Sequence, residues 1–212
     1  MRQFEIDGRQ EFNLKNTWED LLFNDYIEFQ KLEREKDLLG IDENYVIKVL
    51  LILTDCTEND ILNIQLDLLN EIMIDVKFIN LPIPKVDAKF IEIDGEKWSF
   101  KKDLNKLTMG EYISIKTFQE NAKDDLEATS LVLSCLFRKV KEEKEDGELV
   151  LDSFKPDDCK KISDLLKTKV KLVELYHYLT FFFDGTSQST LKDTEAYSAV
   201  EGLKQQTSET TK

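Results

Sequence analysis

Proton transfer near neutral pH is the chemistry of histidine, and this chain has a single histidine, His177. A Ser–His–Asp or Cys–His arrangement would also need a nucleophile beside it and a carboxylate to orient the ring. Glu174 lies one helical turn before His177, but no nucleophile motif accompanies the pair. We therefore expect a half-buried or surface histidine, with a functional role as the alternative. One histidine also excludes every multi-histidine metal site.

The three cysteines, Cys56, Cys135 and Cys159, have no CxxC spacing, which is typical of small core or half-buried residues. A zinc site would need all three of them together with His177. The segment 55–60 carries several oxygen ligands, but it lacks the central glycine and the twelfth-position glutamate of a calcium loop. The sequence therefore predicts no metal ligand and no cofactor, and unpaired thiols indicate a reducing compartment.

Carboxylates are the remaining reactive groups, and 43 Asp and Glu residues make chance pairs frequent. Two adjacent pairs, Asp124-Asp125 and Asp157-Asp158, stand at predicted helix starts, where carboxylates satisfy free amides and favour the helix dipole. The alternative is paired acid–base catalysis, as in a glycosidase or a metal-dependent nuclease. Neither GxGxxG nor GxxxxGK[ST] occurs in the chain. We expect a protein that is not an enzyme and has no catalytic residues.

Composition narrows the class of protein further. With 212 residues, 41% of them hydrophobic, the chain is long enough for a sizeable core. Its net charge of −14 opposes contact with a phosphate backbone, so we expect no sequence-specific nucleic-acid binding. The longest uninterrupted apolar run, 49–53, is too short to span a bilayer, and residues 1–16 lack a secretion signal. These features predict an intracellular protein without a membrane segment.

The elements that would position these residues are mostly helices. Residues 1–16 alternate weakly and predict a short hairpin or an extended arm. Three helices with apolar residues at spacings of three and four then follow, each with a capping residue, over 17–37, 42–53 and 57–76. Thr17 with Asp20, and Thr57 with Asp60, resemble capping boxes. The N-terminal part is therefore expected to be a three-helix bundle that ends before Pro82.

After Pro84 the period changes to that of strands. Alternation on both sides of Asp94-Gly95 predicts a hairpin over 90–100, and residues 109–113 predict a third short strand or a helix start. A helix is expected from Asp124 to Val140, then a short strand or extended link at 149–151. A final helix or helix pair should run over 156–183.

These elements predict an α+β fold, mainly α-helical, with a small antiparallel hairpin or sheet in the middle. We expect an N-terminal arm or hairpin at 1–16 and a single helical domain over 17–184, with a β insertion at about 88–116. Residues 185–212 are rich in Thr, Ser, Gln, Lys and Glu, which predicts a flexible polar tail that becomes ordered on a partner.

Aromatic side chains are the candidates for a contact surface. Phe181, Phe182 and Phe183 cannot all face one side of a helix, so at least one should be exposed or meet a partner. Trp98 and Tyr112 are candidates on the central hairpin and the segment after it. For Trp98 the alternative is core packing, because alternation places it on the same face as Phe100.

The order of several motifs resembles a known group of proteins. A Trp-Glu-Asp-Leu helix start at 18–21 is followed by the apolar helix at 46–53 and the proline break. The hairpin, Leu-Thr-Met-Gly-Glu-Tyr-Ile at 107–113, an acidic helix and the Phe-Phe-Phe ending complete the order. Over 15–183 the chain is similar to small acidic proteins of the structural modules of tailed phages, including crAss-like phages.

This resemblance implies a non-enzymatic role in the virion or its assembly, as a connector or tail component or as packaged cargo. The partners would be other virion or assembly proteins, or further copies of the chain in a ring, and the location would be the virion or the host cytoplasm. An assembly chaperone that is absent from the mature particle is an alternative. An intracellular adaptor unrelated to virions is another.

Overall fold

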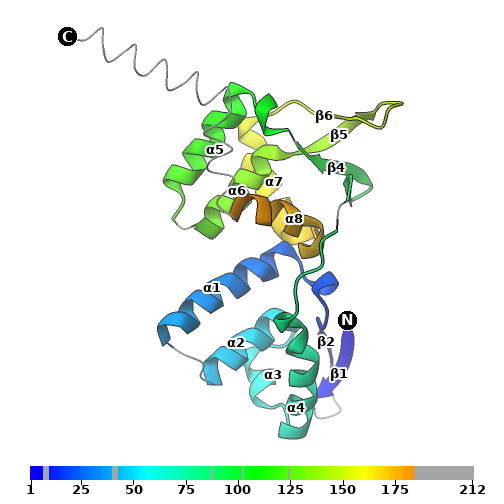
Figure 1. The fold of residues 1–212 in the computed structure, drawn as a ribbon. Helices are drawn as coiled ribbons and strands as arrows, with labels where there is room; N and C mark the ends of the chain where they lie inside the picture. The colour runs from blue at the N-terminus through cyan, green and yellow to red at the C-terminus, as the bar shows by residue number, and fades with distance from the viewer. Residues whose placement is uncertain (7–9, 40–42, 87, 102, 124, 184–212) are drawn as a thin grey trace, which may run out of the picture. The chain divides into compact units, whose positions relative to one another are not determined.

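The computed structural model describes residues 1–6, 10–39, 43–86, 88–101, 103–123 and 125–183, with the side chains at 10, 37–39 and 180–183 left aside (Figure 1). These residues form an α+β fold that is mainly helical, as the sequence predicts, with two antiparallel sheets in the part described. The chain divides into two compact units. Unit 1 comprises Met1–Val86 and Lys167–Tyr176, and unit 2 comprises Asp87–Leu166 and His177–Lys212. This division differs from the single domain expected over 17–184.

Unit 1 begins with a hairpin, which is one of the two forms expected of residues 1–16. Strand β1 (Arg2–Ile6) pairs with β2 (Gln10–Leu14), so that Phe4 lies opposite Phe12 with their ring centroids 5.8 Å apart. The apolar residues of both strands share one buried face: Phe4, Ile6, Phe12 and Leu14. The Lys15 amide donates to the Leu53 carbonyl at 2.8 Å, which attaches the hairpin to the end of a helix.

The helices of unit 1 are short and separated by turns. They are α1 (Phe23–Leu39), α2 (Glu43–Leu53), α3 (Glu58–Leu62) and α4 (Leu66–Asp75), with 3-10 turns η1 (Trp18–Asp20) and η2 (Val76–Asn80). The single helix expected over 57–76 is wrong, because the chain turns at Asn63 and a second helix starts at Leu66.

The first helix also starts later than the sequence predicts. Thr17 makes no side-chain capping bond, and only the 3-10 turn η1 follows it. The backbone near Leu21 pairs instead with the returning segment of unit 1, because Leu172 donates to the Leu21 carbonyl at 2.9 Å. Phe23 donates to the Val170 carbonyl at 3.0 Å. These long-range bonds hold 21–22 extended and delay α1 until Phe23.

Unit 2 is built on a four-stranded antiparallel sheet in the order β3-β4-β5-β6. The strands are β3 (Ile91–Ile93), β4 (Glu96–Phe100), β5 (Phe137–Glu143) and β6 (Leu149–Leu151). The hairpin predicted around Asp94-Gly95 is confirmed, and both of these residues have a positive φ, 52° and 79°. Gly95 adopts this conformation without steric cost because it lacks a Cβ.

The remaining described helices belong wholly or in part to unit 2. They are α5 (Met109–Asn121), α6 (Asp125–Leu136), α7 (Cys159–Lys169) and α8 (Leu172–Phe183), with turns η3 (Leu104–Lys106) and η4 (Pro156–Asp158). The last two helices form the helix pair expected over 156–183, and residues 167–176 of this pair belong to unit 1. Segment 109–113 is a helix start, one of its two expected forms.

The helix expected from Asp124 to Val140 ends early, at Leu136, so its predicted end is wrong. Phe137 instead opens β5, because it pairs with Phe100 of β4 while Lys139 pairs with Trp98. Phe137 is fully buried, and its ring lies 4.6 Å from that of Phe100 and 5.3 Å from that of Trp98. Strand pairing and aromatic packing therefore outweigh the helical period that continues through the sequence.

Among the described helices, none has both the length and the apolar character that crossing a bilayer requires.

Candidate functional site

The aromatic side chains singled out from the sequence have different environments. Trp98 is 7% exposed and Tyr112 is 5% exposed, so both pack in the core of unit 2. Their burial agrees with core packing, which is the alternative for Trp98, and the interface role expected of both stays a prediction. Phe181, Phe182 and Phe183 end α8, and their side chains lie outside the described residues.

The other residues with reactive groups are also placed. His177 is exposed on α8, next to the ring of Tyr178. All three cysteines are buried, and the sulfurs of Cys135 and Cys159 are 3.8 Å apart. In the described parts of the chain, no three His, Cys, Asp or Glu residues come together as a metal site would require.

The described members of the two carboxylate pairs, Asp125, Asp157 and Asp158, stand at helix starts, as the sequence predicts. Asp125 opens α6, and Asp124 lies outside the described residues. Asp157 and Asp158 form η4, directly before α7.

Unit 1 has a notable group of exposed apolar side chains on α4. Leu66 is 76% exposed and Ile74 is 61% exposed, with half-buried Met73 between them along the helix. Spacings of seven and eight residues place these side chains on one side of an α-helix. Leu62, at the end of α3, is also exposed. We call Leu62, Leu66, Met73 and Ile74 the α4 surface.

Acidic residues border the α4 surface. Asp67, Glu71 and Asp75 follow one another at spacings of four residues and form a stripe along α4. The segment 58–75 has no Lys or Arg. Arg2 of β1 partly compensates this charge, because its guanidinium pairs with Glu71 at 3.1 Å and with Asp75. An exposed apolar strip beside an acidic stripe is the pattern of a protein-contact surface.

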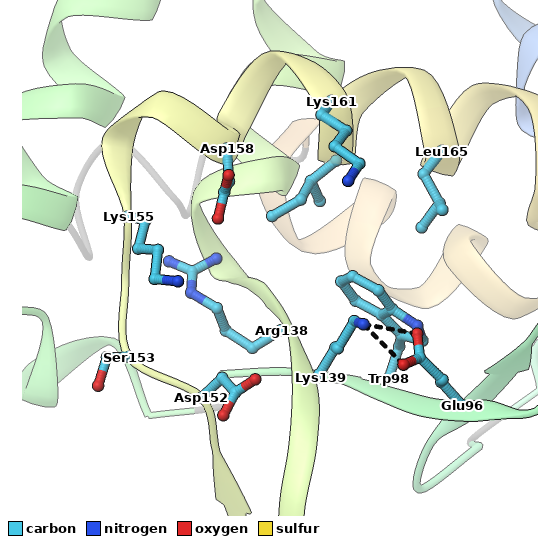
Figure 2. Close-up of a pocket in the computed structure, with 11 residues that line it drawn as sticks. Glu96, Trp98, Arg138, Lys139, Asp152, Ser153, Lys155, Asp158, Lys161 and Leu165 are labelled. Carbon is cyan, nitrogen blue, oxygen red and sulfur yellow. Dashed lines mark hydrogen bonds and ion pairs between the residues drawn. The ribbon is translucent and has the colours of Figure 1, made fainter.

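Unit 2 has a candidate site of another kind, a pocket of about 510 Å³ between the sheet and the start of α7 (Figure 2). Trp98 and Lys139 line it from β4 and β5, and Lys161 and Leu165 line it from α7. Its charged lining residues are of both signs: Arg138, Lys139, Lys155 and Lys161 against Glu96, Asp152 and Asp158. The volume is within the range of small-molecule sites, roughly 300–1,000 Å³.

Arg138 is a buried residue that lines this pocket. Its guanidinium donates to the carbonyls of Ser134 at 2.9 Å and Phe137 at 2.8 Å, and to that of Cys135, so it caps the end of α6. The ring of Phe154 lies 4.6 Å from the guanidinium carbon. Burial lowers the pKa of Arg138, while the nearby Glu111 carboxylate opposes that shift.

The Glu111 carboxylate is held by a capping box at the start of α5. One of its oxygens accepts from the Thr108 amide at 2.7 Å and from the Lys101 ammonium at 2.7 Å. Its other oxygen lies 3.5 Å from Arg138 Nη2. Glu111 is only 4% exposed, so a local helix cap also serves as the buried counter-ion of two cations.

The buried cysteines adjoin this charged group. Cys159 begins α7 directly after Asp158, and Cys135 supplies one of the carbonyls that Arg138 binds. The Cys135 thiol beside it lowers the pKa of Cys159 to about 7, and the Arg138 charge acts in the same direction.

Sequence reasoning missed both candidate sites. The pocket combines residues from three segments, 96–98, 138–139 and 152–165. The sequence predicts a helix over 124–140, which would include Arg138, but Arg138 lies on strand β5. For Glu111 a signal was present, because Thr108 and Glu111 have the spacing of a capping box. The residues of the α4 surface lie outside the apolar face that periodicity predicts for this segment, and no sequence signal indicates that they are exposed together.

Comparison with known proteins assigns no function to these sites. No family model, curated protein or solved structure matches the chain. The function therefore has to be inferred from the geometry of the two units and from the motifs of the sequence.

Proposed function

We propose that the chain is a non-enzymatic structural or assembly protein of a tailed phage that acts through contacts with other proteins. The α4 surface is the observation that supports the contact function, because two large apolar side chains, Leu66 and Ile74, are exposed about two turns apart on one side of the helix. Burying such groups against a partner contributes roughly 25 cal/mol per Å² of apolar surface removed from water.

The charge around the α4 surface indicates the chemistry of the partner. The acids of 58–75 have no basic residue within that segment, so a basic segment would gain both attraction and faster association. An amphipathic helix with Leu and Lys or Arg on the contacting side fits an apolar strip beside an acidic stripe. We therefore take the partner surface to be a basic amphipathic helix of another phage protein.

The phage assignment rests on different support. It comes from the motifs shared with small acidic phage proteins, from the helix start at 18–21 to Leu-Thr-Met-Gly-Glu-Tyr-Ile at 107–113. Mass spectrometry of purified particles and of their head and tail precursors tests it. A fixed copy number in the particle supports a structural component, and presence only in precursors supports an assembly chaperone. Absence from both overturns the phage assignment in favour of an adaptor.

A defined peptide tests the contact function separately. A fluorescent helical peptide of Leu and Lys should bind the full chain, and its anisotropy should fall as salt is added, because salt screens the charge. The double variant Leu66→Gln with Ile74→Gln should weaken binding at least about tenfold, since it removes apolar contact and keeps every charge. A matched peptide with Glu in place of Lys should not bind.

The chain offers a matched control on α5. Met109 and Ile113 are also exposed apolar residues one turn apart, 47% and 54% exposed, and Lys116 lies on the same helix. The double variant Met109→Gln with Ile113→Gln should therefore bind the peptide like the original chain. Equal weakening by both double variants would mean that the peptide contacts exposed apolar side chains without selecting α4. No weakening by either would mean general attraction to an acidic protein, and both results would overturn the assignment to α4.

A further inference from the structure

The pocket of unit 2 contains two hydrogen-bond donors that have no acceptor. Trp98 Nε1 and Arg138 Nε are both buried and make no hydrogen bond in the structure. Both residues line the pocket. A buried donor without a partner costs on the order of 1–3 kcal/mol, and an ordered water or a bound group that supplies an acceptor removes that cost. What both donors lack is an acceptor, such as a carboxylate oxygen.

Two cationic side chains at the rim of the pocket also favour an anionic ligand. Lys155 precedes η4 and Lys161 lies on α7, and both side chains line the pocket (Figure 2). Both residues are exposed, and no described residue forms an ion pair with either ammonium group. They would attract an anion before it reached the buried donors.

The indole of Trp98 is covered by an ion pair that can open. Lys139 Nζ lies 2.6 Å from Glu96 and 5.4 Å from the centre of the Trp98 ring (Figure 2). Both side chains of this pair are about half exposed, 43% and 53%. Exposed pairs of this kind are worth only about 0–1 kcal/mol, so an incoming anion can replace Glu96 as the partner of Lys139 at little cost.

The charge and shape of the lining distinguish between kinds of anion. Lys139 of the lining pairs with Glu96, and Arg138 faces Glu111, so the charges that remain are those of Lys155 and Lys161 against Asp152 and Asp158. A single carboxylate charge is met by the two lysines, whereas the second charge of phosphate would face the two aspartates. Ile162, Leu165 and the Trp98 ring offer apolar surface beside the charged groups.

We propose that this pocket binds a monocarboxylate that carries an apolar group. The carboxylate accepts from Trp98 Nε1, with Lys155 and Lys161 as the cations of the rim, while the apolar group packs on Leu165 and the indole. A free fatty acid and the C-terminal leucine of a peptide share this chemistry. Hexanoate and N-acetylleucine represent the two sources, and their uncharged amides, hexanamide and N-acetylleucinamide, are the matched controls.

The two indole N–H groups make the test internally controlled. Trp18 Nε1 already donates to the Leu81 carbonyl at 3.1 Å, whereas Trp98 Nε1 has no acceptor. In ¹H–¹⁵N spectra of the full chain, a carboxylate should shift the Trp98 indole resonance downfield in a saturable way and leave that of Trp18 in place. Comparing hexanoate with N-acetylleucine identifies the source, and the amides and inorganic phosphate should cause no saturable shift.

Variants at the rim test the role of charge without disturbing the buried donors. Lys155→Gln with Lys161→Gln should weaken carboxylate binding by about tenfold, as expected for the loss of a charged contact. Lys31→Gln with Lys48→Gln in unit 1 changes the net charge equally and should leave the affinity unchanged. A Trp98 resonance that does not move at high carboxylate concentration would overturn the proposal. So would equal shifts with the amides, or binding of phosphate alone.

Discussion

Unit 1 and unit 2 each begin a helix with a complete capping box, and the two boxes differ in their surroundings. Thr57 and Asp60 cap α3 at the surface of unit 1, where their bonds to each other satisfy the first turn. Thr108 and Glu111 cap α5 with the same bonds, but Lys101 and Arg138 also contact the buried carboxylate. A local signature of this kind determines where a helix starts, and tertiary packing determines what else the carboxylate does.

The comparison extends to how each unit distributes polar and apolar groups. Unit 1 exposes large apolar side chains on α4, and unit 2 buries a carboxylate and a guanidinium beneath a pocket. Buried charges are costly unless they are paired, whereas exposed apolar groups cost little until a partner covers them. We infer that unit 1 is suited to contact with a protein surface and unit 2 to holding a small polar group.

Removing the buried carboxylate of the α5 capping box should have the largest effect on the free energy of unfolding. Glu111→Gln leaves the Arg138 guanidinium buried without a counter-ion, and such changes typically cost about 3–5 kcal/mol of folding free energy. Asp60→Asn, the matched change in unit 1, should alter stability far less, because Asp60 is near the surface. Urea unfolding of both variants measures the two costs. Similar small losses for both would contradict the structural difference between the boxes.

Removing the threonine of each box should have a smaller effect. Thr57→Ala and Thr108→Ala each delete a side chain that accepts from the third helical amide, at a typical cost of about 1 kcal/mol. Both threonine hydroxyls also donate to the carboxylate of their box, at 2.6 Å for Thr57 and 3.0 Å for Thr108. Thr108→Ala should be the more costly of the two, since the carboxylate that loses this bond, Glu111, is buried. Thermal unfolding of the two variants gives the order, and a larger loss for Thr57→Ala would contradict it.

The α4 surface should tolerate polar substitution. Leu66→Gln and Ile74→Gln change side chains that are already mostly in water, so each should alter the free energy of unfolding by no more than about 0.5 kcal/mol. Ile72→Ala on the same helix serves as the contrast, because Ile72 is 1% exposed. A large loss from either glutamine variant would show that these side chains pack within the chain, and that the α4 surface is not a contact site.

Lowering the pH should change the stability difference between the original chain and Thr57→Ala, and this is the smallest of the predicted effects. Hydrogen bonds from Thr57 lower the pKa of Asp60 below its ordinary value of about 4. A lowered folded-state pKa stabilises the fold above the unfolded-state pKa, and this contribution is lost as the pH falls through the folded-state pKa. The stability difference between the original chain and Thr57→Ala should therefore shrink below about pH 4. A difference that stays constant down to pH 2 would contradict the pKa shift.

Local signals predicted several elements correctly. The Asp94-Gly95 turn has the residues that positive φ requires, and Thr57 with Asp60 forms the capping box its sequence indicates. The errors arose where a distant segment determines the backbone. Phe137 follows a helical period but pairs with Phe100, and Leu21 bonds with Leu172, which is far away in the sequence.

The candidate sites were less predictable than the fold. Periodicity places Ile72 and Val76 on the apolar face, and both are buried, but only the structure shows that Leu66 and Ile74, outside that face, are left exposed. Arg138 and Glu111 are far apart in the sequence, and their contact depends on α5 packing near the first residues of β5. Burial and long-range ion pairs depend on tertiary packing, so a sequence pattern alone cannot specify them.

The most direct test of contact through unit 1 maps amide shifts while a basic helical peptide of Leu and Lys is added to the ¹⁵N-labelled full chain. We expect the largest shifts within 58–75, centred on the exposed side of α4, and little change in α5 at 109–121. Shifts spread over the acidic residues of both units, with no maximum on α4, would contradict the account.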